Sequence, residues 1–204
     1  MITLYGRMNA WHVRKVIWLL HEIGLDFKRL DYGRGHAPLN TPEFLALNPN
    51  GLVPVLDDGG FILWESNSIL RYLAAKYGAE ELYPADVRRR AIVDQWLDWQ
   101  LSVAVPPIRI LFYALCYPLE PQPPEAVEAA LASAGRAMGV LDARLANAPY
   151  VAGPTFSIAD CALGVTAHRW MKLDADKPDL PALSDYYARI SERPAFKTRV
   201  AVAP

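Results

Sequence analysis

The sequence predicts an α/β unit, with the element order strand-helix-strand-helix-strand-strand-helix, followed by an all-helical bundle. Strand and helix periodicities alternate over residues 1–78, and only helical periodicity follows residue 86. A hydrophobic content of 52% with 21% charged residues is typical of an ordinary globular protein with a sizeable core. We therefore divide the chain into a first domain at residues 1–78, a linker at 79–86 and a helical domain at 87–204.

The first half of the α/β unit alternates a strand, a helix and a strand. A β-rich run at residues 2–5 ends at Gly6, and a helical apolar pattern then runs until Gly24. Residues 26–31 predict the second strand, and residues 32–40 form a loop rich in glycine, proline and asparagine. The apolar positions of the helix are Val13, Val16, Ile17 and Leu20.

The second half of the unit contains a short helix, a hairpin and a longer helix. Thr41 before Pro42 is typical of a helix start, and predicts a helix near residues 42–48. The strands 53–56 and 61–63 flank Asp-Asp-Gly-Gly, a strong hairpin signal, and a helix then runs to about Tyr77. This order is that of a thioredoxin-like domain, in which ligands bind at strand ends beside helix N-termini.

Helical patterns account for the rest of the chain. The pattern at 91–105 meets Pro106-Pro107, which we expect to kink or end that helix. A proline-rich break at 118–124 precedes a long amphipathic helix at 125–145 and a buried helix at 157–172. Ser157 and Asp160 form a capping box at the start of that buried helix, which we interpret as structural.

Charge and cysteine content narrow the class of protein. The net charge of −1 and the lack of a basic cluster give no basis for nucleic-acid binding. The two cysteines, Cys116 and Cys161, do not suggest a disulfide framework. No signal peptide or membrane-spanning apolar run is evident, so we expect a cytoplasmic protein that does not bind membranes.

Two short motifs predict a ligand site. Pro54 lies inside an apolar strand pattern, where it cannot donate to a sheet ladder. If the Val53-Pro54 bond is cis, the N–H and C=O of Val53 turn outward and can pair with an extended peptide. Glu65 and Ser66 precede a helix and would offer a carboxylate, a hydroxyl and helix N-terminal N–H groups. The alternative for Glu65-Ser66 is an ordinary helix start.

These motifs, in this order and spacing, resemble the glutathione transferase superfamily. The resemblance runs from residues 2–7, through residues 156–160, to residues 193–196. It implies that Val53, before a cis Pro54, pairs with the cysteinyl backbone of glutathione, and that Glu65 and Ser66 hold its γ-glutamyl end. It also implies a homodimer, a hydrophobic electrophile as second substrate and no metal. Leu52 stands where many relatives carry lysine or glutamine, so one contact to the glycine carboxylate of glutathione is expected to be missing.

The group that activates the glutathione thiol is the open question. Many similar bacterial members carry serine near the start of the first helix, and here Ala10 occupies that position. Asn9 is our first candidate, because its amide can donate to a thiolate without titrating. The indole N–H of Trp11 is the second, and an N-cap role for Asn9 is its alternative.

Three functions remain open on this sequence. The first is conjugation of glutathione to an apolar electrophile. The second is glutathione-dependent peroxide reduction. The third is glutathione or ligand binding without turnover, because Ala10 removes the usual hydroxyl and a fold does not dictate function.

Overall fold

The structure, a computed structural model, describes residues 1–116 and 121–201, so part of the proline-rich break expected at 118–124 lies outside the described residues. The chain forms two compact units, Met1–Tyr83 with the segment from Arg193 onward, and Pro84–Glu192. The change from one unit to the other falls within the linker expected at 79–86. The segment after Arg193 belongs to the first unit, whereas the sequence-based division placed it in the helical domain.

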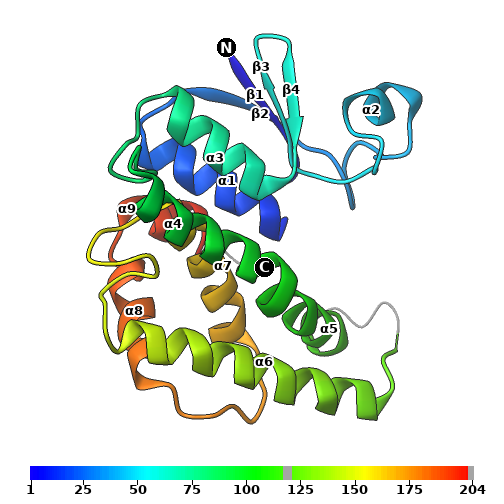
Figure 1. Ribbon diagram of the computed structural model, residues 1–204. Coiled ribbons are helices and arrows are strands. Elements are labelled where there is room, and N and C mark those ends of the chain that lie inside the picture. Colours follow the sequence, from blue (N-terminus) through cyan, green and yellow to red (C-terminus); the bar gives the residue numbers. More distant parts are fainter. Residues whose placement is uncertain (117–120, 202–204) are drawn as a thin grey trace. The chain divides into compact units, whose positions relative to one another are not determined.

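The first unit contains a four-stranded mixed sheet (Figure 1). The strand order is β2-β1-β3-β4; β1 and β2 are parallel, while β3 is antiparallel to both β1 and β4. This sheet and its helices confirm the predicted thioredoxin-like order. The strands are β1 (Ile2–Tyr5), β2 (Phe27–Leu30), β3 (Val55–Asp58) and β4 (Phe61–Trp64).

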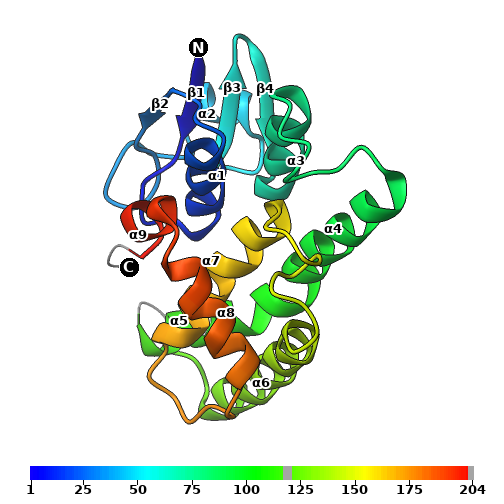
Figure 2. The same ribbon diagram turned by 90° about the vertical axis from the view of Figure 1, so that its left-hand side faces the viewer.

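Four helices surround this sheet. α1 (Trp11–Glu22) and α3 (Ser66–Lys76) pack side by side, and α2 (Pro42–Leu47) lies across the strands from them (Figures 1 and 2). Apolar residues of α1 such as Val13, Ile17 and Leu20 are fully buried, as their helical spacing predicts. α9 (Pro194–Arg199) packs on α1, where the Arg193 guanidinium donates two hydrogen bonds to the Glu22 carboxylate.

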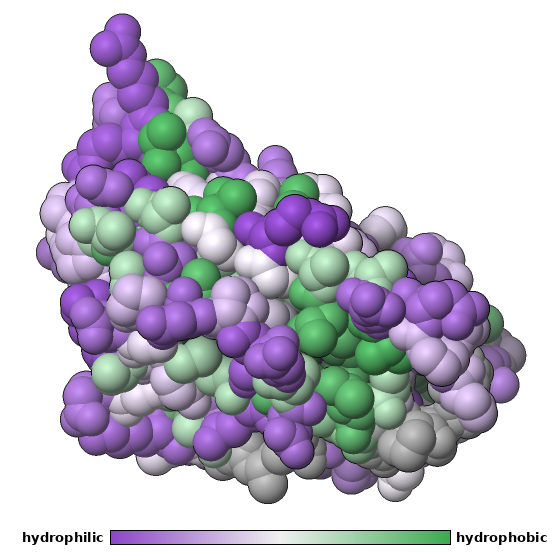
Figure 3. All heavy atoms as spheres, turned by 90° about the horizontal axis from the view of Figure 1, so that it is seen from below, coloured by the Kyte–Doolittle hydropathy of each residue, from purple (hydrophilic) through white to green (hydrophobic). Residues whose placement is uncertain are grey.

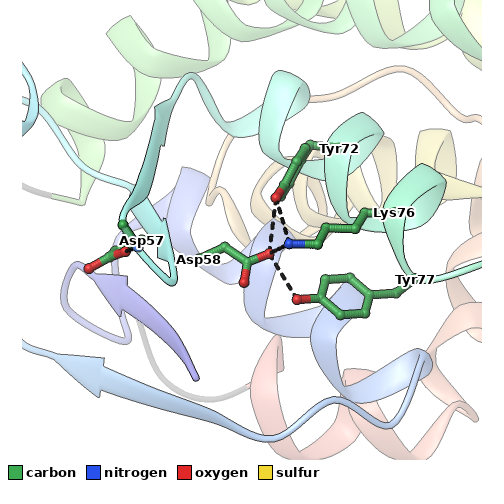
Figure 4. A network of polar contacts seen from close by, with 6 residues as sticks. Asp57, Asp58, Tyr72, Lys76 and Tyr77 are labelled. Atoms are coloured by element: carbon green, nitrogen blue, oxygen red, sulfur yellow. Dashed lines mark hydrogen bonds and ion pairs between the residues drawn. The ribbon is translucent and has the colours of Figure 1, made fainter.

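The β3–β4 hairpin is tied to the end of α3 by a polar network (Figure 4). Asp58 Oδ2 accepts hydrogen bonds from Lys76 Nζ at 2.6 Å, Tyr77 Oη at 2.8 Å and Tyr72 Oη at 3.0 Å. Asp57 accepts from the Gly60 N–H at 2.7 Å and closes the turn between the strands. The predicted Asp-Asp-Gly-Gly turn is therefore present, and it holds the far end of α3 against the sheet.

The second unit is all helical. α7 is the most buried helix, and α4 and α8 pack against it. The helix predicted at 91–105 is interrupted before Pro106-Pro107, as expected, but the regular α-helix already ends at Trp99. A π-helical turn at Gln100–Ala104 leads into α5, and the prolines lie in its first turn, where their missing N–H groups cost little. The helices are α4 (Val87–Trp99), α5 (Val105–Leu115), α6 (Pro124–Leu145), α7 (Ile158–Lys172) and α8 (Pro181–Ser191).

The predicted capping box begins α7. The Asp160 side chain is fully buried and accepts hydrogen bonds from the Ser157 N–H at 2.8 Å and the Val151 N–H at 2.9 Å. Burial raises the pKa of Asp160 to about 6, although these hydrogen bonds oppose the rise. The cap thus joins the loop around Val151 to the start of the central helix.

Part of the helical unit's surface is apolar (Figure 3). Described residues of α5 and α6, among them Leu115, Val127 and Leu131, line a hollow of about 510 Å³ within this unit. Over residues 1–116 and 121–201, no helix combines the length and apolar character needed to cross a lipid bilayer.

The buried carboxyl of Asp160 predicts a pH-dependent stability. Because its pKa of about 6 exceeds the ordinary value of 3.8, the folded state binds the proton more tightly than the unfolded state. Stability from this group is therefore present at low pH and is lost as pH rises from about 4 through about 6, by about 3 kcal/mol in all. Urea unfolding of wild type and Asp160→Asn across this range should show the falling component only in wild type. Asp86→Asn, at the exposed cap of α4, is the control, and equal slopes in all three proteins would contradict the prediction.

Candidate functional site

Three loop segments enter or leave the sheet at the same edge. The strand register aligns Tyr5 with Leu30 on one side and with Val55 on the other, and aligns Val55 with Trp64. The chain leaves β1 just after Tyr5, enters β3 just before Val55 and leaves β4 just after Trp64. The segments that precede α1, β3 and α3 therefore gather at this edge, and they contain the residues that the sequence predicts as a ligand site.

The first segment, residues 6–10, is held tightly. The N–H of Gly6 donates to Leu30 O at 2.8 Å, and a Cβ added at Gly6 would lie 2.5 Å from Val13 Cγ2 and 3.2 Å from Val53 Cβ. With a φ of +143°, this position also disfavours any residue with a side chain. The absence of a Cβ thus lets the first segment approach the segment before β3.

Ala10 is the N-cap of α1, so the alternative reading of Asn9 as the helix cap was wrong. The side chain of Ala10 supplies no hydrogen bond to the first turn, and Asn9 lies exposed just before it. Trp11, at 7% exposure, is buried at the first helical position, and its ring stacks parallel to that of His12. Of the two predicted activating residues, Asn9 is therefore the more accessible.

The second segment contains the Val53-Pro54 bond, which is cis as the sequence comparison implied. β3 begins only at Val55, so the strand predicted from residue 53 starts two residues too early. Across the described residues, Val53 takes part in neither strand pairing nor a backbone hydrogen bond of the loops. Its peptide groups thus remain available to an extended ligand.

The loop before Val53 is shaped by a buried asparagine. Asn48 Nδ2 donates to Leu52 O at 2.8 Å, and Asn48 Oδ1 accepts from the Asn50 N–H at 3.0 Å. Gly51, with a φ of +60°, completes this turn. The Leu52 side chain is 61% exposed as a result, and cannot supply the polar contact that a lysine or glutamine would.

The third segment places Glu65 and Ser66 at the N-terminus of α3, as predicted. Glu65 is the N-cap, with an exposed side chain and a φ of +71°. Among the described residues it is the only non-glycine with a positive φ, a conformation that costs about 1–3 kcal/mol and is common at ligand sites. Ser66 is buried in the first turn.

Two buried basic residues of α1 support these segments and were not identified from the sequence. Arg14 donates from Nε to Met8 O at 3.2 Å, and so fixes the first segment. Lys15 Nζ donates to Asn67 Oδ1 at 2.7 Å, directly behind Ser66. The sequence could have revealed them, because Arg14 and Lys15 are charged residues that interrupt an apolar run in the middle of a helix.

The edge thus combines an available peptide unit at Val53, a carboxylate and hydroxyl at Glu65 and Ser66, and the N-terminus of α1. An extended peptide could pair with Val53 while an ammonium group meets Glu65 and a carboxylate meets the N-terminus of α3. The positive end of the α1 dipole would favour a thiolate placed beside residues 9–11. The fold is that of a thioredoxin-like unit, and the groups at this edge could together bind a small extended peptide.

Comparison with known proteins identifies the family. A model of the glutathione S-transferase N-terminal domain matches residues 1–75, and one of the C-terminal domain matches residues 124–189. Glutathione S-transferase GstB of Escherichia coli strain K12 is 35% identical over 205 residues, covering 99% of both chains. The chain therefore belongs to the glutathione S-transferase family.

Two further proteins are similar to this chain over nearly its whole length. The crystal structure of the theta class glutathione S-transferase from Xanthomonas axonopodis pv. citri, with glutathione bound, superposes with a TM-score of 0.93. The two sequences are 39% identical, and the match covers 99% of this chain and 98% of the other. The disulfide-bond oxidoreductase YfcG of Escherichia coli is 32% identical, over 96% of this chain and 92% of YfcG.

The close approach at Gly6 predicts that Gly6→Ala destabilises the protein. Gly59→Ala is a matched control, because Gly59 also has a positive φ but nothing lies within 4 Å of an added Cβ. Both changes pay about 1–2 kcal/mol for the left-handed backbone, and Gly6→Ala should cost roughly a further 1–3 kcal/mol for overpacking against Val13. Urea unfolding measures the difference, and equal losses in the two variants would show that the close approach is unimportant.

Proposed function

We propose that this protein binds glutathione and conjugates it, through its sulfur, to an apolar electrophile. The observation that carries the proposal is the meeting of cis Val53-Pro54 with the Glu65-Ser66 helix start at one sheet edge. Membership of the family and the glutathione-bound Xanthomonas neighbour support the same ligand. A cytoplasmic homodimer with a role in detoxification would follow the family resemblance, and analytical ultracentrifugation would test the dimer.

Each group at the edge has a proposed role in binding. The peptide unit of Val53 pairs with the cysteinyl backbone of glutathione, and Pro54 fixes its direction. Glu65 meets the γ-glutamyl ammonium, while the Ser66 hydroxyl and the α3 N-terminus meet the γ-glutamyl carboxylate. The exposed Leu52 contributes its backbone, but its apolar side chain gives the glycine carboxylate no polar contact.

Thiol activation is assigned to Asn9 with Trp11 and the α1 N-terminus. A free thiol has a pKa of about 8.5, and lowering it by about two units requires roughly 2.7 kcal/mol of stabilisation for the thiolate. One amide hydrogen bond to a charged sulfur, together with the helix dipole, is of that size. Trp11 is buried, so in this scheme it shapes the sulfur position while Asn9 donates.

Two alternatives to conjugation remain. The protein could use glutathione for redox chemistry, or it could bind glutathione without any turnover. Ala10 offers no donor to the sulfur, which favours a protein that holds glutathione without activating it for conjugation. The relative YfcG is named as a disulfide-bond oxidoreductase, which favours a redox function in general, and glutathione-dependent peroxide reduction is the redox alternative that we consider. Glutathione titration, followed by assays with an aromatic electrophile and with an organic peroxide, separates the three outcomes.

The binding assignment predicts the effect of Ser66→Ala. Loss of a hydrogen bond to a charged carboxylate is worth about 1.5–3 kcal/mol, so glutathione affinity should fall by roughly ten- to hundredfold. Ser68→Ala, two residues further along α3, is the matched control and should bind as wild type does. Isothermal titration calorimetry gives both affinities. An unchanged affinity in Ser66→Ala would remove Ser66 from the site.

The activation assignment predicts opposite effects for two neighbouring changes. Asn9→Ala should raise the pKa of bound glutathione and lower kcat/KM by about tenfold, since a hydrogen bond to the thiolate is lost. Ala10→Ser should lower that pKa by adding a hydroxyl at the start of α1. The ultraviolet absorbance of the thiolate, followed against pH, measures both. If Asn9→Ala leaves the thiol pKa unchanged, Asn9 is not the donor.

A further inference from the structure

Lys15 lies in an unusual place for a lysine. It is fully buried on α1, whereas lysine almost always keeps its ammonium in water. Its Nζ donates to Asn67 Oδ1 at 2.7 Å, and Asn67 is itself buried as the second residue of α3. The ammonium therefore sits directly behind the turn formed by Glu65 and Ser66.

Charged groups from α3 face this ammonium. The Glu65 carboxylate attracts it, the Arg71 guanidinium repels it, and burial has the largest effect. Together they lower the pKa of Lys15 from 10.5 to about 7. A proton can thus leave or join the buried Lys15 near neutral pH, and this changes the charge that attracts the exposed Glu65 carboxylate.

The turn that Lys15 supports is strained. Glu65 holds a φ of +71°, which a non-glycine residue keeps only when its surroundings fix it. The hydrogen bond from Lys15 fixes Asn67, two residues further on, and the positive charge of Lys15 attracts the Glu65 carboxylate. Both effects depend on a protonated Lys15, because a neutral amine attracts the Glu65 carboxylate far less and is a weaker donor to Asn67.

We propose that Lys15 is a positioning residue, whose buried ammonium holds Asn67 and Glu65 so that the Glu65-Ser66 turn binds the γ-glutamyl end of glutathione. The inference rests on the proposed glutathione site and adds that protonation of Lys15 regulates the affinity of that site. Binding of the γ-glutamyl end takes up a proton wherever Lys15 is neutral in the free protein. Affinity is therefore constant below the pKa of Lys15 and falls above it.

The test uses S-methylglutathione, which has no titrating thiol, in calorimetric titrations of the full chain between about pH 6 and about pH 9. Wild-type affinity should fall by up to about tenfold per pH unit above neutral, with proton uptake revealed by two buffers of different ionisation enthalpy. Lys15→Met should bind weakly at every pH. Lys15→Arg, whose charge cannot be removed, should bind better than Lys15→Met and without this pH dependence.

The outcomes separate this inference from the proposed function. Lys28→Met, at an exposed position of β2, is the control and should keep the wild-type pH profile. A wild-type affinity that stays constant without proton uptake overturns the role of Lys15, as does tight binding by Lys15→Met. The wild-type profile decides the matter even if a Lys15 variant does not fold. If wild type binds no S-methylglutathione at any pH, the proposed glutathione site fails and the inference fails with it.

Discussion

The central constraint on this structure is the strand register that places Leu30, Tyr5, Val55 and Trp64 in one row across the sheet. Because these residues end or begin their strands together, the loops before α1, β3 and α3 meet at a single edge. Gly6 lets two of these loops come into close contact. Each loop alone would be an ordinary connection, and their meeting creates the candidate ligand site.

The two parts of this edge differ in the side chains that they offer to a ligand. The part that would hold the γ-glutamyl end has a strained Glu65, a buried Ser66 and a fully buried Lys15 behind them. The strained backbone of Glu65 and the buried ammonium of Lys15 both cost stability. The part that would hold the sulfur begins with Ala10, which supplies no side-chain group. The costly features therefore lie where the ligand would be held, and fewer groups lie where its thiol would be activated. For this reason glutathione binding is the stronger part of the proposal, and catalysis depends on Asn9 and the α1 dipole.

Local patterns predicted most of the fold. Turn residues at 57–60 and the capping box at Ser157 predicted their elements correctly because these signals act within a few residues. Two features were not predicted, one of them a distortion of the helix itself and the other a contact between residues distant in sequence. The prolines at 106 and 107 fit inside a helix because a π-helical turn precedes them. Lys15 and Asn67, separated along the chain, form a buried pair only because α1 packs on α3.

A crystal structure with glutathione bound tests the central claim most directly. The account predicts that the cysteinyl backbone pairs with the peptide unit of Val53, and that the γ-glutamyl end contacts Glu65 and Ser66. It also predicts that the Asn9 side-chain amide lies within hydrogen-bonding distance of the sulfur. Glutathione bound elsewhere, or bound without contact to Val53 and Ser66, would contradict the account.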